Sequence, residues 1–346
     1  MREFFIGSRR IADDEPPFVV AEIGSNHCGE MDKAYNLTEE AQKCGCDAIK
    51  LQRRHNKDLY TDEFYNKQYS SENAYGNTYG EHRERLEFPI QALCLLQKLS
   101  ERLNMQMFAT AFDFASVDDL LVIGVPCIKI ASGDIKNTPL IRYASAGGTP
   151  LIISTGGAIM DDCKRAADAC QSPFALLHCV ASYPNQAHEM NLAAIVAMRE
   201  AFPGTVIGLS DHYNGTCMSL AAYMLGARIF EKHFTLDHTW KGTDHALSLQ
   251  PDGMRRLVRD LKRIREAIGD GIKRQLYSEE IPLYKMGKGL YFKDDMQAGE
   301  EVHAEHIDIR SPADGLAPYQ AELILGRVLA QNVVRQQPVE MEVFNV

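Results

Sequence analysis

The sequence predicts an α/β protein: a (β/α)8 TIM barrel followed by a small β-rich C-terminal domain. Three observations support this architecture. Short apolar runs bounded by Gly and Pro alternate eight times with amphipathic stretches between Phe18 and Ile268. Eight such units in about 250 residues fit a barrel. The first run is not followed by Gly-x-Gly-x-x-Gly, which argues against a doubly wound sheet, and after Gly269 the pattern changes to short runs and turns.

Each apolar run has the length and composition of a buried parallel strand. In chain order, the predicted strands are Phe18–Gly24, Ala48–Gln52, Met105–Ala111, Cys127–Ser132, Pro150–Gly156, Phe174–Val180, Thr205–His212 and Arg228–Phe234. The stretches between them have one apolar face, as helices that cover a sheet do. They include Lys33–Cys44, Ile90–Leu103, Leu192–Ala201 and Thr216–Leu225.

The same pattern predicts the domain boundaries. Residues 1–17 form an N-terminal cap segment, 18–270 the barrel, 271–285 a linker and 286–346 the second domain. One long interruption, residues 53–87, separates the second strand from its helix. It is polar and rich in tyrosine, and such long connections are commonly functional lids. We therefore expect a lid there.

Composition narrows the function classes. The chain has 37 Lys and Arg against 47 Asp and Glu, a net charge of −10, which disfavours nucleic-acid or anionic-membrane partners. It lacks an apolar run approaching the roughly 18 residues of a membrane span, and its start turns charged too early for a signal peptide. The nine cysteines are scattered without Cys-x-x-Cys, which suggests reduced thiols and a cytoplasmic protein.

Polar residues gather at the carboxyl ends of the predicted strands. Catalytic groups of TIM barrels lie at that end, and buried polar groups are costly unless they are paired. The set comprises Glu22, Lys50, Gln52, Thr110, Lys129, Ser132, Ser154, His178, Tyr183, Ser210, His212, Glu231 and His233. A closed barrel would bring these side chains to one site.

The residue types suggest a phosphate-bearing substrate and a metal. Two lysines and four hydroxyl groups supply point charges and short donors for a phosphate. His212 and His233 lie on neighbouring strands, and two imidazoles completed by water and substrate oxygens suit Mn²⁺ better than a closed zinc site. Glu22 and Asp244 are carboxylates available for proton transfer. Ser210, Asp211 and His212 alternate along one strand, so they cannot form a hydrolase triad.

Several segments in order resemble the sialic acid synthase family. They are "FVVAEIGSNHCG", "IKLQ", "IKIASGD", "LIISTGG", "LLHCVASYP", "IGLSDH", "EKHFT" and "GTDHALSL". The family includes legionaminic and pseudaminic acid synthases and spore-coat polysaccharide synthase-like proteins. "IDIRSPADGLAP" and "LGRVLAQNV" in turn resemble the antifreeze-like SAF domain. The resemblance implies a transferase that condenses phosphoenolpyruvate with an N-acylated hexosamine, giving a nonulosonic acid and phosphate.

The resemblance also implies roles for single residues. It makes Lys50, Thr110, Lys129, Ser132, Ser154 and Ser210 ligands of phosphoenolpyruvate. His212 and His233 would hold the metal, with Mn²⁺ expected first and Mg²⁺ or Co²⁺ as alternatives. Glu22, Asp134 and Asp244 would be catalytic, and Gln52, Tyr183 and Arg310 would contact the sugar. Arg310 would come from the partner subunit of a domain-swapped homodimer.

The chain departs from the family pattern near the expected sugar site. Asp134 stands where members often have Glu, and Ala181 where they often have Asn. These departures leave the hexosamine open, and other functions stay open as well. The acceptor could be another sugar or a sugar phosphate, as in the related Kdo-8-phosphate synthases. Lys50 or Lys129 could form the Schiff base of a class I aldolase, or the fold could serve binding alone.

Overall fold

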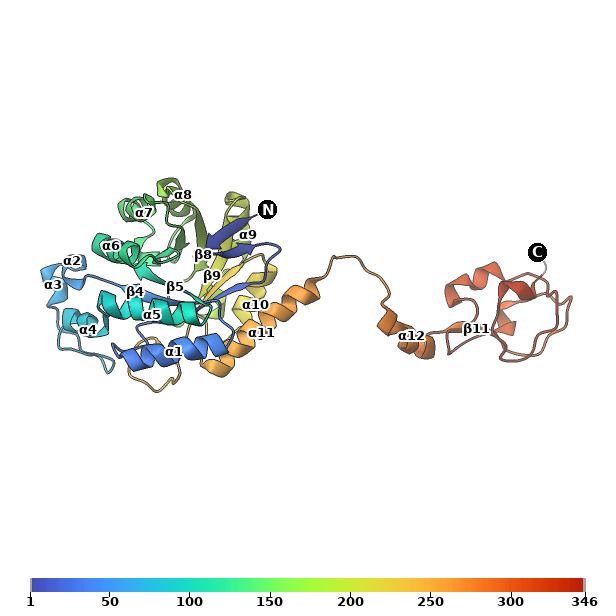
Figure 1. The fold of residues 1–346 in the computed structure, drawn as a ribbon. Coiled ribbons are helices and arrows are strands. Elements are labelled where there is room, and N and C mark those ends of the chain that lie inside the picture. Colours follow the sequence, from blue (N-terminus) through green and yellow to red (C-terminus); the bar gives the residue numbers. More distant parts are fainter. Residues whose placement is uncertain (1, 345–346) are drawn as a thin grey trace. The chain divides into compact units, whose positions relative to one another are not determined.

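The computed structural model describes residues 2–344, which divide between Ile268 and Gly269 into two compact units. The first unit contains a closed parallel barrel in the strand order β10-β3-β4-β5-β6-β7-β8-β9 (Figure 1). These strands are β3 (Phe18–Gly24), β4 (Ala48–Arg53), β5 (Gln106–Ala111), β6 (Ile128–Ile130), β7 (Leu151–Ser154), β8 (Phe174–Cys179), β9 (Val206–Asp211) and β10 (Ile229–His233). The predicted barrel is confirmed, and each predicted strand end lies within two residues of the observed one.

Helices surround the barrel and bury one face against it (Figure 1). They are α1 (Met31–Lys43), α5 (Ile90–Arg102), α6 (Phe114–Ile123), α7 (Thr138–Ser145), α8 (Met160–Ala169), α9 (Ala193–Ala201), α10 (Cys217–Met224) and α11 (Pro251–Ile268). Local sequence fixes their ends. Asp113 caps α6 by accepting a hydrogen bond from the Ser116 N–H at 2.7 Å, and Gly124 ends that helix in the left-handed conformation.

A hairpin covers the amino ends of the barrel strands. It consists of β1 (Glu3–Ile6) and β2 (Arg9–Ala12), whose Phe4, Ile6 and Ile11 belong to the barrel's apolar core. Asp13, which follows the hairpin, lies 3.7 Å from the guanidinium of Arg228, the residue that directly precedes β10. The hairpin does not cover the opposite, carboxyl ends of the strands, where the active site of a barrel is expected.

The segment of residues 53–87 follows β4 and contains α2 (Asn56–Leu59), α3 (Asp62–Tyr65) and α4 (Tyr79–Leu86). Thr78 and Glu81 form a reciprocal capping box at the start of α4. The segment also reaches the loop after β10. The Gly242 N–H donates to Asn73 Oδ1 at 3.0 Å, and the Tyr75 hydroxyl donates to the Lys241 carbonyl at 2.5 Å. We call residues 53–87 the lid segment.

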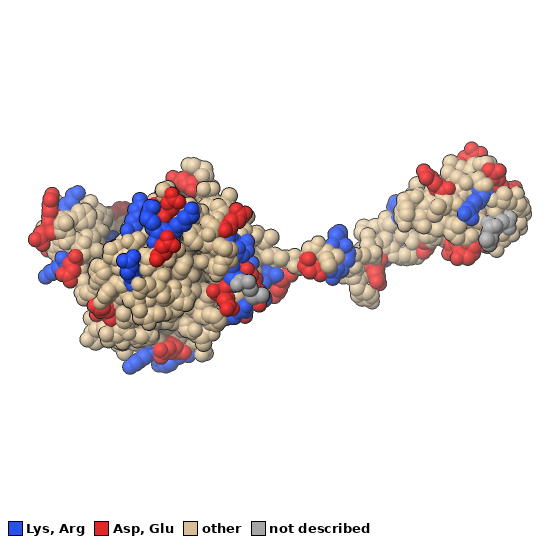
Figure 2. Space-filling view, turned by 90° about the horizontal axis from the view of Figure 1, so that it is seen from above, with Lys and Arg blue, Asp and Glu red and all other residues tan. Residues whose placement is uncertain are grey.

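The second unit contains α12 (Glu280–Met286) and an antiparallel pair of strands, β11 (Gly289–Phe292) and β12 (Ile307–Arg310). Leu290, Phe292 and Val339 belong to its own apolar core. Within residues 2–344, no helix is both long and apolar enough to cross a membrane. Basic and acidic side chains are interspersed on the face of the first unit seen in Figure 2.

Candidate active site

A cavity of about 630 Å³ opens at the carboxyl ends of the barrel strands. The barrel gathers residues far apart in sequence here, because parallel strands end at the same rim. Of the predicted site residues, those lining the cavity are Glu22, Lys50, Gln52, Thr110, Lys129, Ser132, Ser154, Tyr183, Ser210, His212, His233 and Asp244. Asp134 and His178, which were also expected at this end of the barrel, do not line it, and Arg310 belongs to the second unit.

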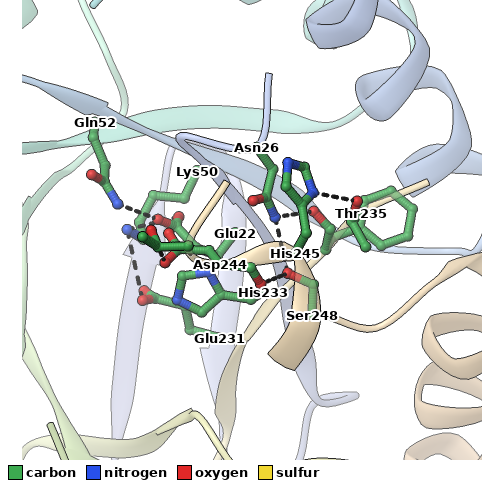
Figure 3. Close-up of polar contacts among 12 residues, drawn as sticks. Glu22, Asn26, Lys50, Gln52, Glu231, His233, Thr235, Asp244, His245 and Ser248 are labelled. Atoms are coloured by element: carbon green, nitrogen blue, oxygen red, sulfur yellow. Dashed lines mark hydrogen bonds and ion pairs between the residues drawn. The ribbon is translucent and has the colours of Figure 1, made fainter. Parts of the chain in front are cut away.

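Lys50 lies between two buried carboxylates on the cavity floor (Figure 3). Its Nζ is 2.8 Å from Glu22 Oε2 and 3.7 Å from Glu231 Oε1, and it donates to Thr110 Oγ1 at 2.9 Å. Burial alone would lower the pKa of Lys50, but Glu22 and Glu231 hold it above its usual value. Lys50 is therefore a fixed positive charge, paired with acids when no anionic ligand is bound.

Lys129 is the second buried ammonium of the floor. Its Nζ donates to Ser154 Oγ at 2.5 Å and to the Ile130 carbonyl at 3.1 Å, and lies 4.0 Å from Glu231 Oε2. Burial lowers the pKa of Lys129. The hydroxyl of Ser210 donates to Glu231 Oε1 at 3.3 Å. Two ammonium groups and several hydroxyls thus face one space, an arrangement suited to a phosphate ester.

His212 and His233 lie beside this floor with ring centroids 5.5 Å apart. His212 Nδ1 is 2.9 Å from the Val180 carbonyl. A carbonyl only accepts, so Nδ1 is the donor of this hydrogen bond, and Nε2 is the ring nitrogen left for another partner. Burial lowers the pKa of His233, which favours the neutral ring. Its buried Nδ1 has no hydrogen-bond partner and lies 3.8 Å from Asp244 Oδ2.

These two imidazoles fit the predicted metal. The hydrogen bond from His212 to a backbone carbonyl orients its ring as in protein metal sites. Among the residues that the structure describes, no group of three or more His, Cys, Asp or Glu side chains forms a ligand set. Any ion at this place would therefore need water or substrate oxygens besides His212 and His233.

One aromatic ring and two polar side chains complete the upper wall of the cavity. Tyr183 stacks on His212 at 4.1 Å and meets His233 edge-on at 6.0 Å. Gln52 donates to Glu22 Oε1 at 2.9 Å (Figure 3). Asp244 accepts from Thr243 Oγ1 at 3.1 Å. Hydroxyl, amide and carboxylate groups near the imidazoles can hydrogen-bond a polyhydroxylated ligand.

Asp134 and Arg310 each contact residues of their own unit. Asp134 belongs to a short turn after β6, where its Oδ1 accepts from Asn137 Nδ2 at 3.2 Å. Arg310 lies in the second unit and pairs with Asp308 at 2.6 Å. Among the described residues, the Asp134 carboxylate makes no hydrogen bond or ion pair with the residues that line the cavity, and its role and that of Arg310 stay predictions.

Other lining residues were given no role by the sequence. Glu231 shares the inward face of β10 with His233, and the sequence placed it at the strand ends without giving it a role. Cys179 ends β8, and its Sγ lies 4.0 Å from His212 Nδ1. Asn73 and Arg83 come from the lid segment, where no periodic pattern marks which side chains face inward.

A buried ion pair lies on the outer side of the barrel, next to the two histidines in sequence. Lys232 Nζ lies 3.1 Å from Asp211 Oδ2, and both side chains are fully buried on the outer faces of β10 and β9. Ser219 donates to the same Asp211 oxygen at 2.7 Å, and Lys232 donates to the Tyr213 carbonyl. These contacts fix the chain on either side of His212 and the neighbouring His233.

Replacing Lys232 by Met is expected to lower the free energy of unfolding of the first unit by about 3–5 kcal/mol, because it leaves Asp211 as an uncompensated buried charge. Trp240, the only tryptophan, lies in this unit, so its fluorescence during urea denaturation measures the change. Lys164→Met is the control. Its exposed pair with Asp161 at 3.5 Å is worth less than about 1 kcal/mol. Equal effects of the two substitutions would contradict the structural role of Lys232.

Glu22 is poised for proton transfer near neutral pH. Burial, and then the neighbouring Glu231 charge, raise the pKa of Glu22 to about 7, although Lys50 opposes the shift. If Glu22 accepts a proton in the reaction, kcat/KM should fall as the pH drops through about 7. A pH–rate profile measures this, and the residual rate of Glu22→Gln should lack the inflection. A wild-type profile that stays flat from about pH 6 to 8 would exclude Glu22 as that base.

Comparison with known proteins assigns each unit to a protein or domain family. Residues 37–273 match the NeuB family, and residues 287–342 match the SAF domain. Human N-acetylneuraminate-9-phosphate synthase is 35% identical over 305 residues, which cover 87% of this chain and 85% of that protein. The N,N'-diacetyllegionaminic acid synthase of Campylobacter jejuni is 33% identical over 321 residues, or 91% of this chain and 96% of that protein.

A solved structure agrees with these matches. The N-acetylneuraminic acid synthetase of Leptospira borgpetersenii, determined in complex with citrate, aligns with a TM-score of 0.71 and 33% identity. The alignment covers 82% of this chain and 95% of that chain. The resemblance predicted from the sequence motifs is therefore confirmed.

Proposed function

Because this chain belongs to the NeuB family, we propose that it condenses phosphoenolpyruvate with an N-acylated hexosamine, forming a nine-carbon sialic-type acid and releasing phosphate. The relatives are named synthases, and the chain is an enzyme of the synthase type. One observation carries the choice of substrates. Lys50 and Lys129, with their hydroxyl neighbours, line the same cavity as His212 and His233.

Phosphoenolpyruvate binds on the floor of the cavity in this proposal. Lys50 and Lys129 neutralise its phosphate and carboxylate, and Thr110, Ser132, Ser154 and Ser210 supply hydroxyl groups. The open-chain sugar lies above it, with its aldehyde beside His212 and His233. Gln52, Tyr183 and Asp244 hydrogen-bond the sugar's polar groups. Holding both substrates in contact makes the condensation effectively unimolecular.

The reaction then forms one carbon–carbon bond. His212 and His233 would hold a divalent ion, Mn²⁺ first among the candidates, which supplies Lewis-acid polarisation of the aldehyde oxygen when bound. C3 of phosphoenolpyruvate attacks the aldehyde carbon, the aldehyde oxygen takes up a proton from solvent to become a hydroxyl, and positive charge develops at C2. Water adds at C2, and Glu22 takes a proton from that water. The tetrahedral intermediate breaks its C2–O bond and expels phosphate, leaving the ketone.

One feature of the proposal extends beyond the single chain. We expect a homodimer in which the partner's second unit supplies an arginine equivalent to Arg310, an expectation that rests on the motif "RSPADG" around that residue. The expected cytoplasmic location rests instead on the scattered cysteines.

Two alternatives have specific support. The human relative is named for a 9-phosphate product, so a phosphorylated sugar is a possible acceptor. A class I aldolase would use a lysine with a lowered pKa, which burial gives to Lys129. Such an enzyme would consume pyruvate, and borohydride would trap its Schiff base.

The test is phosphate release from phosphoenolpyruvate across a panel of N-acyl hexosamines, with Mn²⁺ and with a chelator. The proposal predicts release that requires both a sugar and the metal. Chelator-insensitive turnover with pyruvate would favour the aldolase instead, and absence of release with every sugar would contradict the proposed reaction.

A further inference from the structure

The cations that line the cavity differ in how their charge is balanced. Lys50 pairs with Glu22 and Glu231, and Lys129 lies within reach of Glu231. Arg54 lies 3.1 Å from Glu87 Oε1. Each of these three positive charges therefore has a carboxylate partner in the protein, as buried charges require.

Arg83, on α4 of the lid segment, is the exception among the described lining cations. Its Nε and Nη2 donate to the Tyr79 hydroxyl at 3.1 and 3.0 Å, and the guanidinium also lies over the Tyr79 ring. Nη1 donates to none of the described residues, and no described carboxylate forms an ion pair with Arg83. Asp244 acts on it only from beyond ion-pair distance.

The position of Arg83 separates it from the phosphoenolpyruvate groups. Lys50 and Lys129 project from barrel strands β4 and β6, whereas Arg83 projects from the lid segment. Asn73 and Tyr75 tie this segment to the loop that follows β10. In the proposed reaction, Lys50 and Lys129 already bind the anionic groups of phosphoenolpyruvate. The half-buried guanidinium of Arg83, which has no carboxylate partner among the described residues, is therefore available to the second substrate.

We propose that Arg83 binds a negatively charged group of the acceptor sugar, so that the enzyme's natural acceptor is an anionic N-acyl sugar. This inference rests on the proposed function and specifies its second substrate. A guanidinium fork matches phosphate and carboxylate oxygens alike. The group is thus either a phosphate ester at the sugar end remote from the aldehyde or a carboxylate on the N-acyl substituent.

The experiment compares N-acetylmannosamine, its 6-phosphate and N-succinylmannosamine as acceptors, by phosphate release from phosphoenolpyruvate. The kcat/KM for one anionic sugar should exceed that for the neutral sugar by at least about 10-fold. Arg83→Gln should lower the kcat/KM for this anionic sugar by at least about 30-fold. The KM for phosphoenolpyruvate should change less than about 3-fold. Arg83→Lys should restore part of the loss, and whichever anionic sugar responds identifies the group.

Arg85→Gln is the matched control, because Arg85 is exposed on the same helix and does not line the cavity. It should leave all three acceptors unaffected. Two results would overturn the proposal: the neutral sugar is the best acceptor, or Arg83→Gln lowers all three alike. The second result would mean that Arg83 only balances Asp244.

A binding measurement separates this proposal from the proposed reaction. If no sugar supports phosphate release, the proposed function fails, and calorimetry with the two anionic sugars still decides the role of Arg83. If an anionic sugar binds the wild type and Arg83→Gln weakens this binding at least about 10-fold, the proposed role of Arg83 stands. If neither anionic sugar binds detectably, or if the variant binds as tightly as the wild type, the proposed role is wrong.

Discussion

His212→Ala is expected to lower metal-dependent turnover by at least about 100-fold while the barrel stays folded, since Lewis-acid activation of a carbonyl is worth several kcal/mol. His212 Nδ1 is engaged by the Val180 carbonyl, so Nε2 is the nitrogen left for a metal. Alanine removes that nitrogen and the ring on which Tyr183 stacks. Phosphate release as a function of Mn²⁺ concentration measures the loss, and calorimetric Mn²⁺ titration provides a readout independent of activity.

His178→Ala is the control for this prediction. His178 lies on the adjacent strand β8, where its Nε2 bonds the Met190 carbonyl at 2.7 Å and its side chain does not line the cavity. This substitution should cost stability but preserve the response to Mn²⁺. Full activity and unchanged Mn²⁺ binding in His212→Ala would refute the assignment of the metal ligands.

The second large effect is expected at Lys129. Lys129→Met removes the ammonium that bonds Ser154 and balances Glu231, so an incoming phosphate would meet a buried carboxylate with fewer positive charges. We expect kcat/KM for phosphoenolpyruvate to fall by about 1,000-fold, the scale for truncating one partner of a buried charge pair. The KM for the sugar should change far less. Steady-state kinetics with each substrate varied in turn measures both.

Lys136→Met provides the comparison, because Lys136 follows the same strand but is 68% exposed and pairs with Asp162. It should retain wild-type kinetics. Borohydride treatment with pyruvate adds a second test at Lys129. If the treatment labels the wild type covalently but not Lys129→Met, the enzyme uses Schiff-base chemistry at Lys129 and the proposed condensation is wrong.

The sequence predicted the barrel well because each strand is a separate apolar run with its own boundaries. The same regularity located the site. Lys50 and Gln52, or Ser210 and His212, lie two residues apart and so share the inward face at a strand end. The same alternation puts Lys232, between Glu231 and His233, on the outer face, where the structure shows it paired with Asp211.

Residues outside regular strands escaped this reasoning. Asp134 was assigned by motif alone, and it lies in a turn that directs it to Asn137. Arg83 lines the cavity only because the lid segment folds back on the loop after β10, a long-range contact without a local sequence signature. Glu231 was placed on the correct face, but its role depends on its distances to Lys50 and Lys129.

The central claim is that one cavity joins phosphoenolpyruvate to a sugar aldehyde with water added at C2. Turnover in ¹⁸O-labelled water, with mass spectrometry of both products, tests it most directly. We predict one phosphate per nine-carbon acid, with the solvent label in the acid's C2 oxygen and unlabelled phosphate. Label in the phosphate would show attack at phosphorus, and phosphate formed without the acid would show that the cavity does not carry out the condensation.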